Sequence, residues 1–167
     1  IDCTVDNKSS DHRLRFVFDS GFATDYTASL VPFDITERDR RDTLKKICSD
    51  GTQPNSGLVY IGENGNGVGI MNEGLYEYEH INSDKGSIAL TLMRCTGIIT
   101  VRPDRLRRYS TQTFDSQCIG IYKMHIGLVF EQGDKDEMIH KLIRKSKLFS
   151  NGMLPCFLYQ YFKNDKK

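Results

Sequence analysis

The sequence predicts a mainly β protein, an antiparallel β-sandwich with one or two short helices. Apolar residues recur at every second position in several separate runs, as they do in strands that bury one face. Clusters of Gly, Asn, Asp and Ser separate these runs, for example Asp19–Gly21, Pro54–Gly57 and Ser83–Gly86. Many short strands divided by such turns are typical of two packed antiparallel sheets.

The 167 residues fit one domain, which we expect to cover residues 1–167. Apolar alternation begins at once, at Ile1, Cys3 and Val5, with no leader before it. This start resembles a strand cut in its middle. We therefore expect the chain to be a fragment of a larger multidomain protein.

Strands are predicted in chain order from their periodicity. Alternation around Leu14–Phe18, Ile88–Met93 and Ile119–Phe130 predicts strands that bury one face, and the last of these is the longest. The continuous apolar run Leu58–Ile61 predicts a short strand covered on both faces. A final strand is predicted at Phe157–Phe162.

One helix is predicted at Asp134–Phe149, where Met138, Ile139, Leu142 and Ile143 fall on one face. Asp134 is a suitable N-cap, and Asn151-Gly152 is a stop signal. A second, highly charged helix is predicted near Thr36–Ile47.

The balance of charge argues against two classes of partner. Lysine and arginine number 23 against 22 acidic residues, so the net charge of +1 does not favour nucleic acid or a membrane surface. No apolar run reaches the roughly 20 residues of a membrane span. Five widely spaced cysteines predict reduced, buried thiols in the cytoplasm, and no His, Cys or Asp spacing predicts a metal site in this chain.

Three motifs suggest chemistry, and each has a simpler structural interpretation. Gly62–Gly69 is rich in glycine but is followed by a strand-like run, so a hairpin is favoured over a phosphate site. The basic stretch Arg102–Tyr109 is interpreted as a solvated loop, with phosphate binding or a shared polar cleft as alternatives. Glu73, Glu77 and Glu79 could supply acid–base chemistry, but a solvated strand edge is favoured and no catalytic residue is predicted.

Five segments in order resemble the C-terminal β region of glycoside hydrolase family 38, the retaining α-mannosidases, and most closely its bacterial, mannosylglycerate hydrolase-like branch. They cover roughly residues 5–130 and are Asp11–Arg15, Pro32–Arg38, Gly67–Glu79, Ile88–Gly97 and Gln117–Gly120. Met124–Gly127 departs from the family, which has a Pro-His-type turn at that point.

The resemblance implies a galactose-mutarotase-like supersandwich that packs on its own catalytic domain. It also implies that this separate domain holds zinc and an Asp nucleophile, none of whose residues maps onto this chain, so no cofactor is expected within it. The expected substrate of the whole enzyme is a carbohydrate, an α-mannoside. Arg94 ends a predicted strand before a turn, and we predict that it binds substrate through paired hydrogen bonds. A strand-end salt bridge is the alternative.

Two other functions stay open. A stand-alone carbohydrate-binding module would need exposed aromatic side chains in a platform, although the chain has no Trp. A mutarotase-like sugar epimerase would need His12 or His125 to face Glu77 in one pocket.

Overall fold

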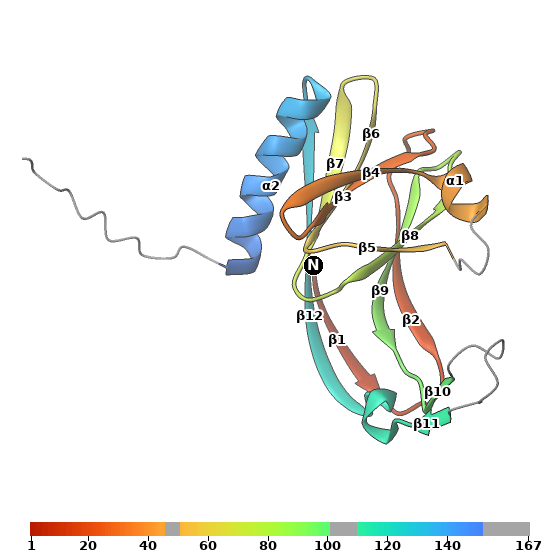
Figure 1. The fold of residues 1–167 in the computed structure, drawn as a ribbon. Coiled ribbons are helices and arrows are strands. Elements are labelled where there is room, and N and C mark those ends of the chain that lie inside the picture. The colour runs from red at the N-terminus through yellow and green to blue at the C-terminus, as the bar shows by residue number, and fades with distance from the viewer. Residues whose placement is uncertain (46–50, 101–109, 152–167) are drawn as a thin grey trace, which may run out of the picture.

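The computed structural model describes residues 1–45, 51–100 and 110–151. It has three layers: a four-stranded antiparallel sheet, a six-stranded antiparallel sheet and a long helix, α2, on the outer face of the larger sheet (Figure 1). The predicted antiparallel β-sandwich with one or two helices is therefore confirmed, and the described residues contain two α-helices. In the described residues no helix is both long and apolar enough to cross a membrane.

The six-stranded sheet has the order β1-β12-β7-β6-β3-β4 and the four-stranded sheet the order β2-β9-β8-β5, while β10 and β11 form a separate hairpin. The bounds of the elements are β1 Asp2–Asn7, β2 Arg13–Asp19, β3 Tyr26–Val31, β4 Asp34–Asp39, α1 Arg40–Lys45, β5 Thr52–Pro54, β6 Leu58–Glu63, β7 Asn66–Asn72, β8 Glu77–Asn82, β9 Ser87–Arg94, β10 Ile98–Thr100, β11 Ser110–Gln112, η1 Phe114–Gln117, β12 Gly120–Gln132 and α2 Lys135–Asn151.

The main core lies between the two sheets. Its buried side chains alternate along each strand, so that Tyr78 in β8 and Leu90 in β9 face Ile70 in β7 and Ile126 in β12. The alternation that predicted these strands therefore reflects burial of one face. The run Leu58–Ile61 is buried on both faces, as predicted, because α2 covers the other side of the larger sheet.

A second core joins α2 to the outer face of the six-stranded sheet. Met138, Ile139 and Leu142 are buried there against β6 and β7. Gly69 makes this close approach possible, because a Cβ at that position would lie 2.7 Å from Cδ2 of Leu142. The helix begins as predicted, since the Asp134 carboxylate accepts a hydrogen bond of 3.0 Å from the backbone N–H of Asp136.

Two hairpins lie within the larger sheet. Between β6 and β7, Asn64 and Gly65 both have positive φ, as a type I′ turn requires, which confirms a hairpin in the glycine-rich stretch Gly62–Gly69. Between β3 and β4, Pro32 and Phe33 form the turn and Phe33 is held at a φ of 70°.

The helix predicted near Thr36–Ile47 is wrong in its first part. Residues 34–39 form β4, and α1 begins only at Arg40. β4 is an edge strand of the sheet, and charged residues protect such edges from pairing with other chains. Of the charged residues in the predicted range, Glu37, Arg38 and Asp39 belong to this edge strand, and Arg40, Arg41, Asp42 and Lys45 belong to α1. The predicted strand at Phe157–Phe162 and the basic stretch Arg102–Tyr109 lie outside the described residues.

Two buried asparagines connect the loops beside α2. Asn72 donates from Nδ2 to Oδ1 of Asn55 at 2.9 Å, and Asn55 donates in turn to the backbone oxygen of Leu75 at the same distance. The backbone N–H groups of Gly57 and Leu75 donate back to these two side chains. The amides therefore satisfy one another and fix the loops that lead into β6 and β8.

Candidate functional site

Arg94, the predicted substrate-binding residue, is the last residue of β9 and is partly exposed. Its Nε and Nη2 both lie 3.2 Å from Oε2 of Glu77 in β8. Arg13 in β2 also approaches this oxygen, with its Nη2 3.6 Å away. One carboxylate therefore lies between two guanidinium groups and holds Arg94 in a defined direction.

The sheet that carries Arg94 is strongly curled. Nη2 of Arg13, in the edge strand β2, donates to Oγ1 of Thr52 in the opposite edge strand β5 at 2.8 Å. Three strand spacings in a flat sheet would place these strands about 14 Å apart, which is farther than an arginine side chain reaches. The sheet must therefore bend toward this face, and the charged residues line its concave side.

Glu79 lies on the same face and forms an ion pair of 2.5 Å with Nη1 of Arg15. Gly51 lies against it, since a Cβ there would be 2.8 Å from Oε1 of Glu79. Both carboxylates that could have formed an acid pair are thus engaged by arginines. Such an arrangement orders these side chains and neutralises their charge.

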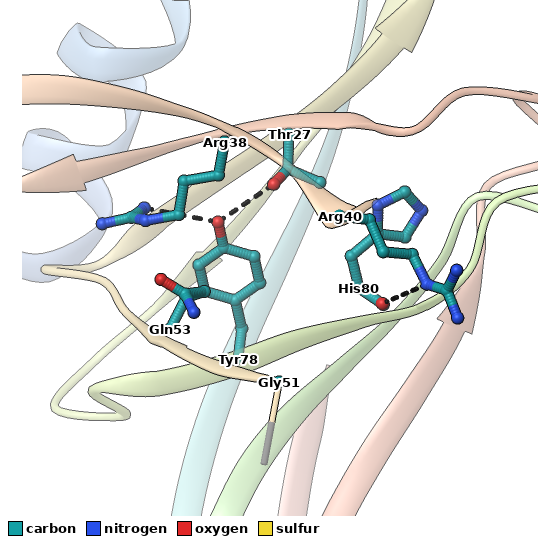
Figure 2. Close-up of a pocket in the computed structure, with 7 residues that line it drawn as sticks. All are labelled: Thr27, Arg38, Arg40, Gly51, Gln53, Tyr78 and His80. Atoms are coloured by element: carbon teal, nitrogen blue, oxygen red, sulfur yellow. Dashed lines mark hydrogen bonds between the residues drawn. The ribbon is translucent and has the colours of Figure 1, made fainter. Parts of the chain in front are cut away.

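The opposite face of β8 contributes to a small polar pocket between the sheets. Thr27, Arg38, Arg40, Gly51, Gln53, Tyr78 and His80 line it (Figure 2). The Tyr78 hydroxyl lies 3.0 Å from Oγ1 of Thr27 and accepts a longer bond of 3.4 Å from Arg38. Arg38 also donates to Ser29. These contacts connect β3 and β4 with β8 and so hold the two sheets together at this point.

His80 is 7% exposed, and within the described residues neither of its ring nitrogens has a hydrogen-bond partner. Burial lowers the pKa of His80, and the Arg40 guanidinium lowers it further, while the backbone of Asn82 and of Asp25 opposes the shift. Arg40 does not bond the ring but donates to the backbone oxygens of His80 and Ile81. The cavity of about 10 Å³ suits roughly one water molecule and excludes a sugar.

The residues required by a mutarotase are not brought together. Glu77 contacts two arginines. His125 in β12 is instead paired with Asp2 in β1, with 2.5 Å between Nδ1 and Oδ1. Nε2 of His12 lies 3.9 Å from Sγ of Cys95. Nor do any three His, Cys, Asp or Glu side chains in the described ranges form a group that could hold a metal ion. That this chain holds no cofactor, and that zinc lies in a separate catalytic domain, both stay predictions.

Sequence reasoning missed the pocket around Tyr78 and His80. The sequence analysis considered Glu77 and Glu79 on one face of the strand. It did not consider Tyr78 and His80, which face the other way. A polar aromatic residue and a histidine on the buried face of a strand could have indicated a polar site between the sheets.

No protein-family model and no curated protein sequence matches the chain. Solved structures do match. An α-mannosidase from Enterococcus faecalis V583 superposes with a TM-score of 0.71 and 27% identity over 87% of this chain. A protein of glycosyl hydrolase family 38 from Enterococcus faecalis superposes with a TM-score of 0.68 and 28% identity over the same share.

The match involves only a part of each solved protein, since it covers 16% of either one. Within this chain it extends over most of the sequence, and the identity accompanies agreement in fold. The predicted resemblance is thereby confirmed: the chain resembles, in fold and sequence, one part of the bacterial α-mannosidases of glycoside hydrolase family 38.

Proposed function

We propose that the chain is an accessory domain of an α-mannosidase-type glycoside hydrolase, and that it packs on a separate, zinc-containing catalytic domain. The observation that carries the proposal is the match of 87% of this chain to 16% of an α-mannosidase. A unit of that size within a larger enzyme contributes stability and surface, while the chemistry is performed elsewhere. The expected location is the cytoplasm and the expected substrate of the whole enzyme is an α-mannoside.

Within this proposal Arg94 reaches the substrate-binding cleft from the concave face of the four-stranded sheet. The contact with Glu77 supports this role because it orients the guanidinium in advance and so reduces the entropy lost on binding. A planar guanidinium can donate two parallel hydrogen bonds to neighbouring sugar hydroxyls. A lysine at the same position would lose that geometry.

The isolated chain should not hydrolyse aryl α-mannosides, with or without added zinc. In the described residues Glu77 and Glu79 are held in ion pairs with arginines, and no three His, Cys, Asp or Glu side chains form a metal-binding group. The measurement is release of the aryl group after repeated purification, with the Enterococcus faecalis α-mannosidase as the positive control. Turnover above a buffer blank that persists through purification would contradict the accessory role.

A chimera tests the role directly: this chain replaces the matching segment of the Enterococcus faecalis α-mannosidase. The chimera should fold and hydrolyse aryl α-mannosides. Arg94→Ala should then lower kcat/KM by about 10- to 100-fold, roughly the worth of a charge-assisted hydrogen bond, and Arg94→Lys should not restore it.

Arg15→Ala is the matched control, because Arg15 forms a similar ion pair with Glu79 on the same face. It should leave kcat/KM unchanged. If Arg94→Ala keeps kcat/KM but sharply lowers the melting temperature, Arg94 is a structural residue. If the chimera folds but is inactive even with Arg94 intact, the accessory role itself fails.

One observation favours the alternative of a stand-alone carbohydrate-binding module. A hollow of about 620 Å³ is lined by Phe22, Phe130, Asn66 and Gln132, and Phe130 is 65% exposed. An exposed aromatic face beside amide groups can receive the apolar face of a sugar ring. Titration calorimetry of the isolated chain with manno-oligosaccharides, repeated with Phe130→Ala, would detect this function.

A further inference from the structure

Two cysteines from distant parts of the chain meet at one end of the sandwich. Cys95 follows β9 directly and is buried, and Cys118 ends η1 and is partly exposed. The backbone N–H of Thr96 donates to the oxygen of Ser116 at 3.2 Å, so the two segments run side by side. These contacts lie within the described residues and are independent of the candidate site.

Asn7 holds both cysteines in place. Its Nδ2 lies 2.8 Å from the backbone oxygen of Cys118 and 3.5 Å from Sγ of Cys95. A third contact of 3.0 Å goes to the oxygen of Gln117. Because the Asn7 side chain is itself in a buried strand position, one fixed amide positions the two thiol-bearing segments relative to each other.

Cys118 packs against the core cluster that contains Cys95. Burial raises the pKa of the Cys95 thiol, and the charge of the neighbouring Cys118 raises it further. Cys118 has left-handed backbone angles, φ 49° and ψ 44°, and its Sγ is 3.6 Å from the oxygen of Ser116. The more exposed Cys118 is therefore the thiol that a reagent meets first, and Cys95 lies behind it.

A histidine stands next to the buried thiol. Nε2 of His12 is 3.9 Å from Sγ of Cys95, and the His12 backbone oxygen accepts a bond of 2.8 Å from the N–H of Cys95. Nδ1 of His12 is buried without a hydrogen-bond partner in the described part of the chain. Nε2 of His12 is therefore the ring nitrogen that faces the Cys95 thiol.

We propose that Cys95 and Cys118 are a redox-active thiol pair, which a small-molecule disulfide such as oxidised glutathione converts into an intramolecular disulfide. The Cys118 thiolate attacks one sulfur of the reagent, forms a mixed disulfide and releases one glutathione thiolate, which takes up a proton. Cys95 gives its proton to Nε2 of His12 and attacks Sγ of Cys118. The S–S bond closes and the second glutathione leaves as a thiolate, which takes up the proton from His12, so that two protein thiols are oxidised while one reagent disulfide is reduced to two thiols.

The bond would join the end of β9, in the four-stranded sheet, to the segment that leads into β12 of the six-stranded sheet. It would therefore link the two sheets covalently at this end. A cross-link that restricts the unfolded chain stabilises the folded one, so oxidation should raise the melting temperature.

The test uses the full chain in glutathione buffers of increasing oxidised fraction, followed by alkylation of free thiols and peptide mass spectrometry. The expected product is a 95–118 cross-linked peptide that dithiothreitol reverses. Cys95→Ser should stop at a glutathione adduct on Cys118, and Cys118→Ser should give no cross-link to Cys95. Cys3→Ser, which removes a cysteine from another strand, should leave the cross-link unchanged.

The role of His12 has its own readout. His12→Gln should slow closure and alter its pH dependence while leaving the final cross-link intact, and an unchanged rate would remove His12 from the step. The pair itself is overturned if wild-type protein retains glutathione on Cys118 without closing. It is equally overturned if Cys95 and Cys118 both stay reduced while Cys3 reacts.

Discussion

Successive residues of β8 serve two different environments. Glu77 and Glu79 point to the concave face, where arginines neutralise them, whereas Tyr78 and His80 point between the sheets. The tyrosine hydroxyl has a partner, but the histidine ring is buried with both nitrogens unbonded within the described structure. His80 is therefore one residue through which acid should act on this fold.

We expect the free energy of unfolding to fall as the pH drops below about 6.5, the ordinary pKa of histidine. The folded pKa of His80 is lowered by burial, so the unfolded chain takes up the proton first. The contribution of His80 to the free energy of unfolding is fully present above the pKa of the unfolded state. It is lost as the pH falls from that value to the lower pKa of the folded state. Below that value, both states carry the proton and this contribution no longer changes.

Denaturant unfolding between pH 7.5 and 5 measures this dependence. His80→Gln should flatten the curve in that range, because glutamine does not titrate. His140→Gln, a change in an exposed histidine of α2, should leave the slope as it is. Equal slopes for wild type and His80→Gln would mean that other groups cause the loss.

At the scale of elements, the position of α2 depends on glycines in the sheet beneath it. Leu142 fills the space above Gly69, and the ring of Phe149 fills the space above Gly127, where a Cβ would lie 3.1 Å from Cε2 of the ring. The helix thus approaches β7 and β12 more closely than any larger residue would permit. Side-chain size in the sheet, as much as the apolar face of the helix, determines their packing.

Gly69→Ala should destabilise the chain by about 1 to 3 kcal/mol, because the new methyl group would lie 2.7 Å from Cδ2 of Leu142, a fully buried side chain. Chemical denaturation gives the value. Leu142→Ala provides the matched test, since it opens the space that the methyl group needs. In that background Gly69→Ala should cost clearly less, and full additivity of the two changes would contradict direct contact.

For the whole molecule, periodicity predicted those strands that bury one face, and α2 with its Asp134 cap, because each of these patterns is local. It did not predict β3 or the edge strand β4, whose charges resemble those of a solvated helix. It placed Arg94 correctly at a strand end but could not reveal that Glu77 would hold it. The contact from Arg13 to Thr52 was equally hidden, because the curl of a sheet depends on residues far apart in sequence.

Among the strand pairs of the described residues, β1 and β12 are the most distant in sequence, with Asp2 opposite His125, 123 residues away. Loop closure of this length is costly before other contacts exist, so we expect β1 to dock after the folding transition state. Val5→Ala should then speed unfolding and leave the folding rate unchanged, whereas Val59→Ala in the local β6–β7 hairpin should slow folding. Stopped-flow kinetics in denaturant would separate these outcomes. Slower folding of Val5→Ala would mean that β1 docks before the transition state, against the prediction.

This pairing also has a consequence during translation. A ribosome adds about 5 to 20 residues per second, so β1 would wait roughly 6 to 25 seconds for its partner strand to be made. Throughout that time the apolar residues Cys3 and Val5 of β1 would have no sheet to join. The edge of β7 that finally pairs with β12 would also be open, because β12 lies between β1 and β7 in the folded sheet. The nascent chain therefore offers an open strand edge to chaperones, and to other nascent chains, until β12 leaves the exit tunnel.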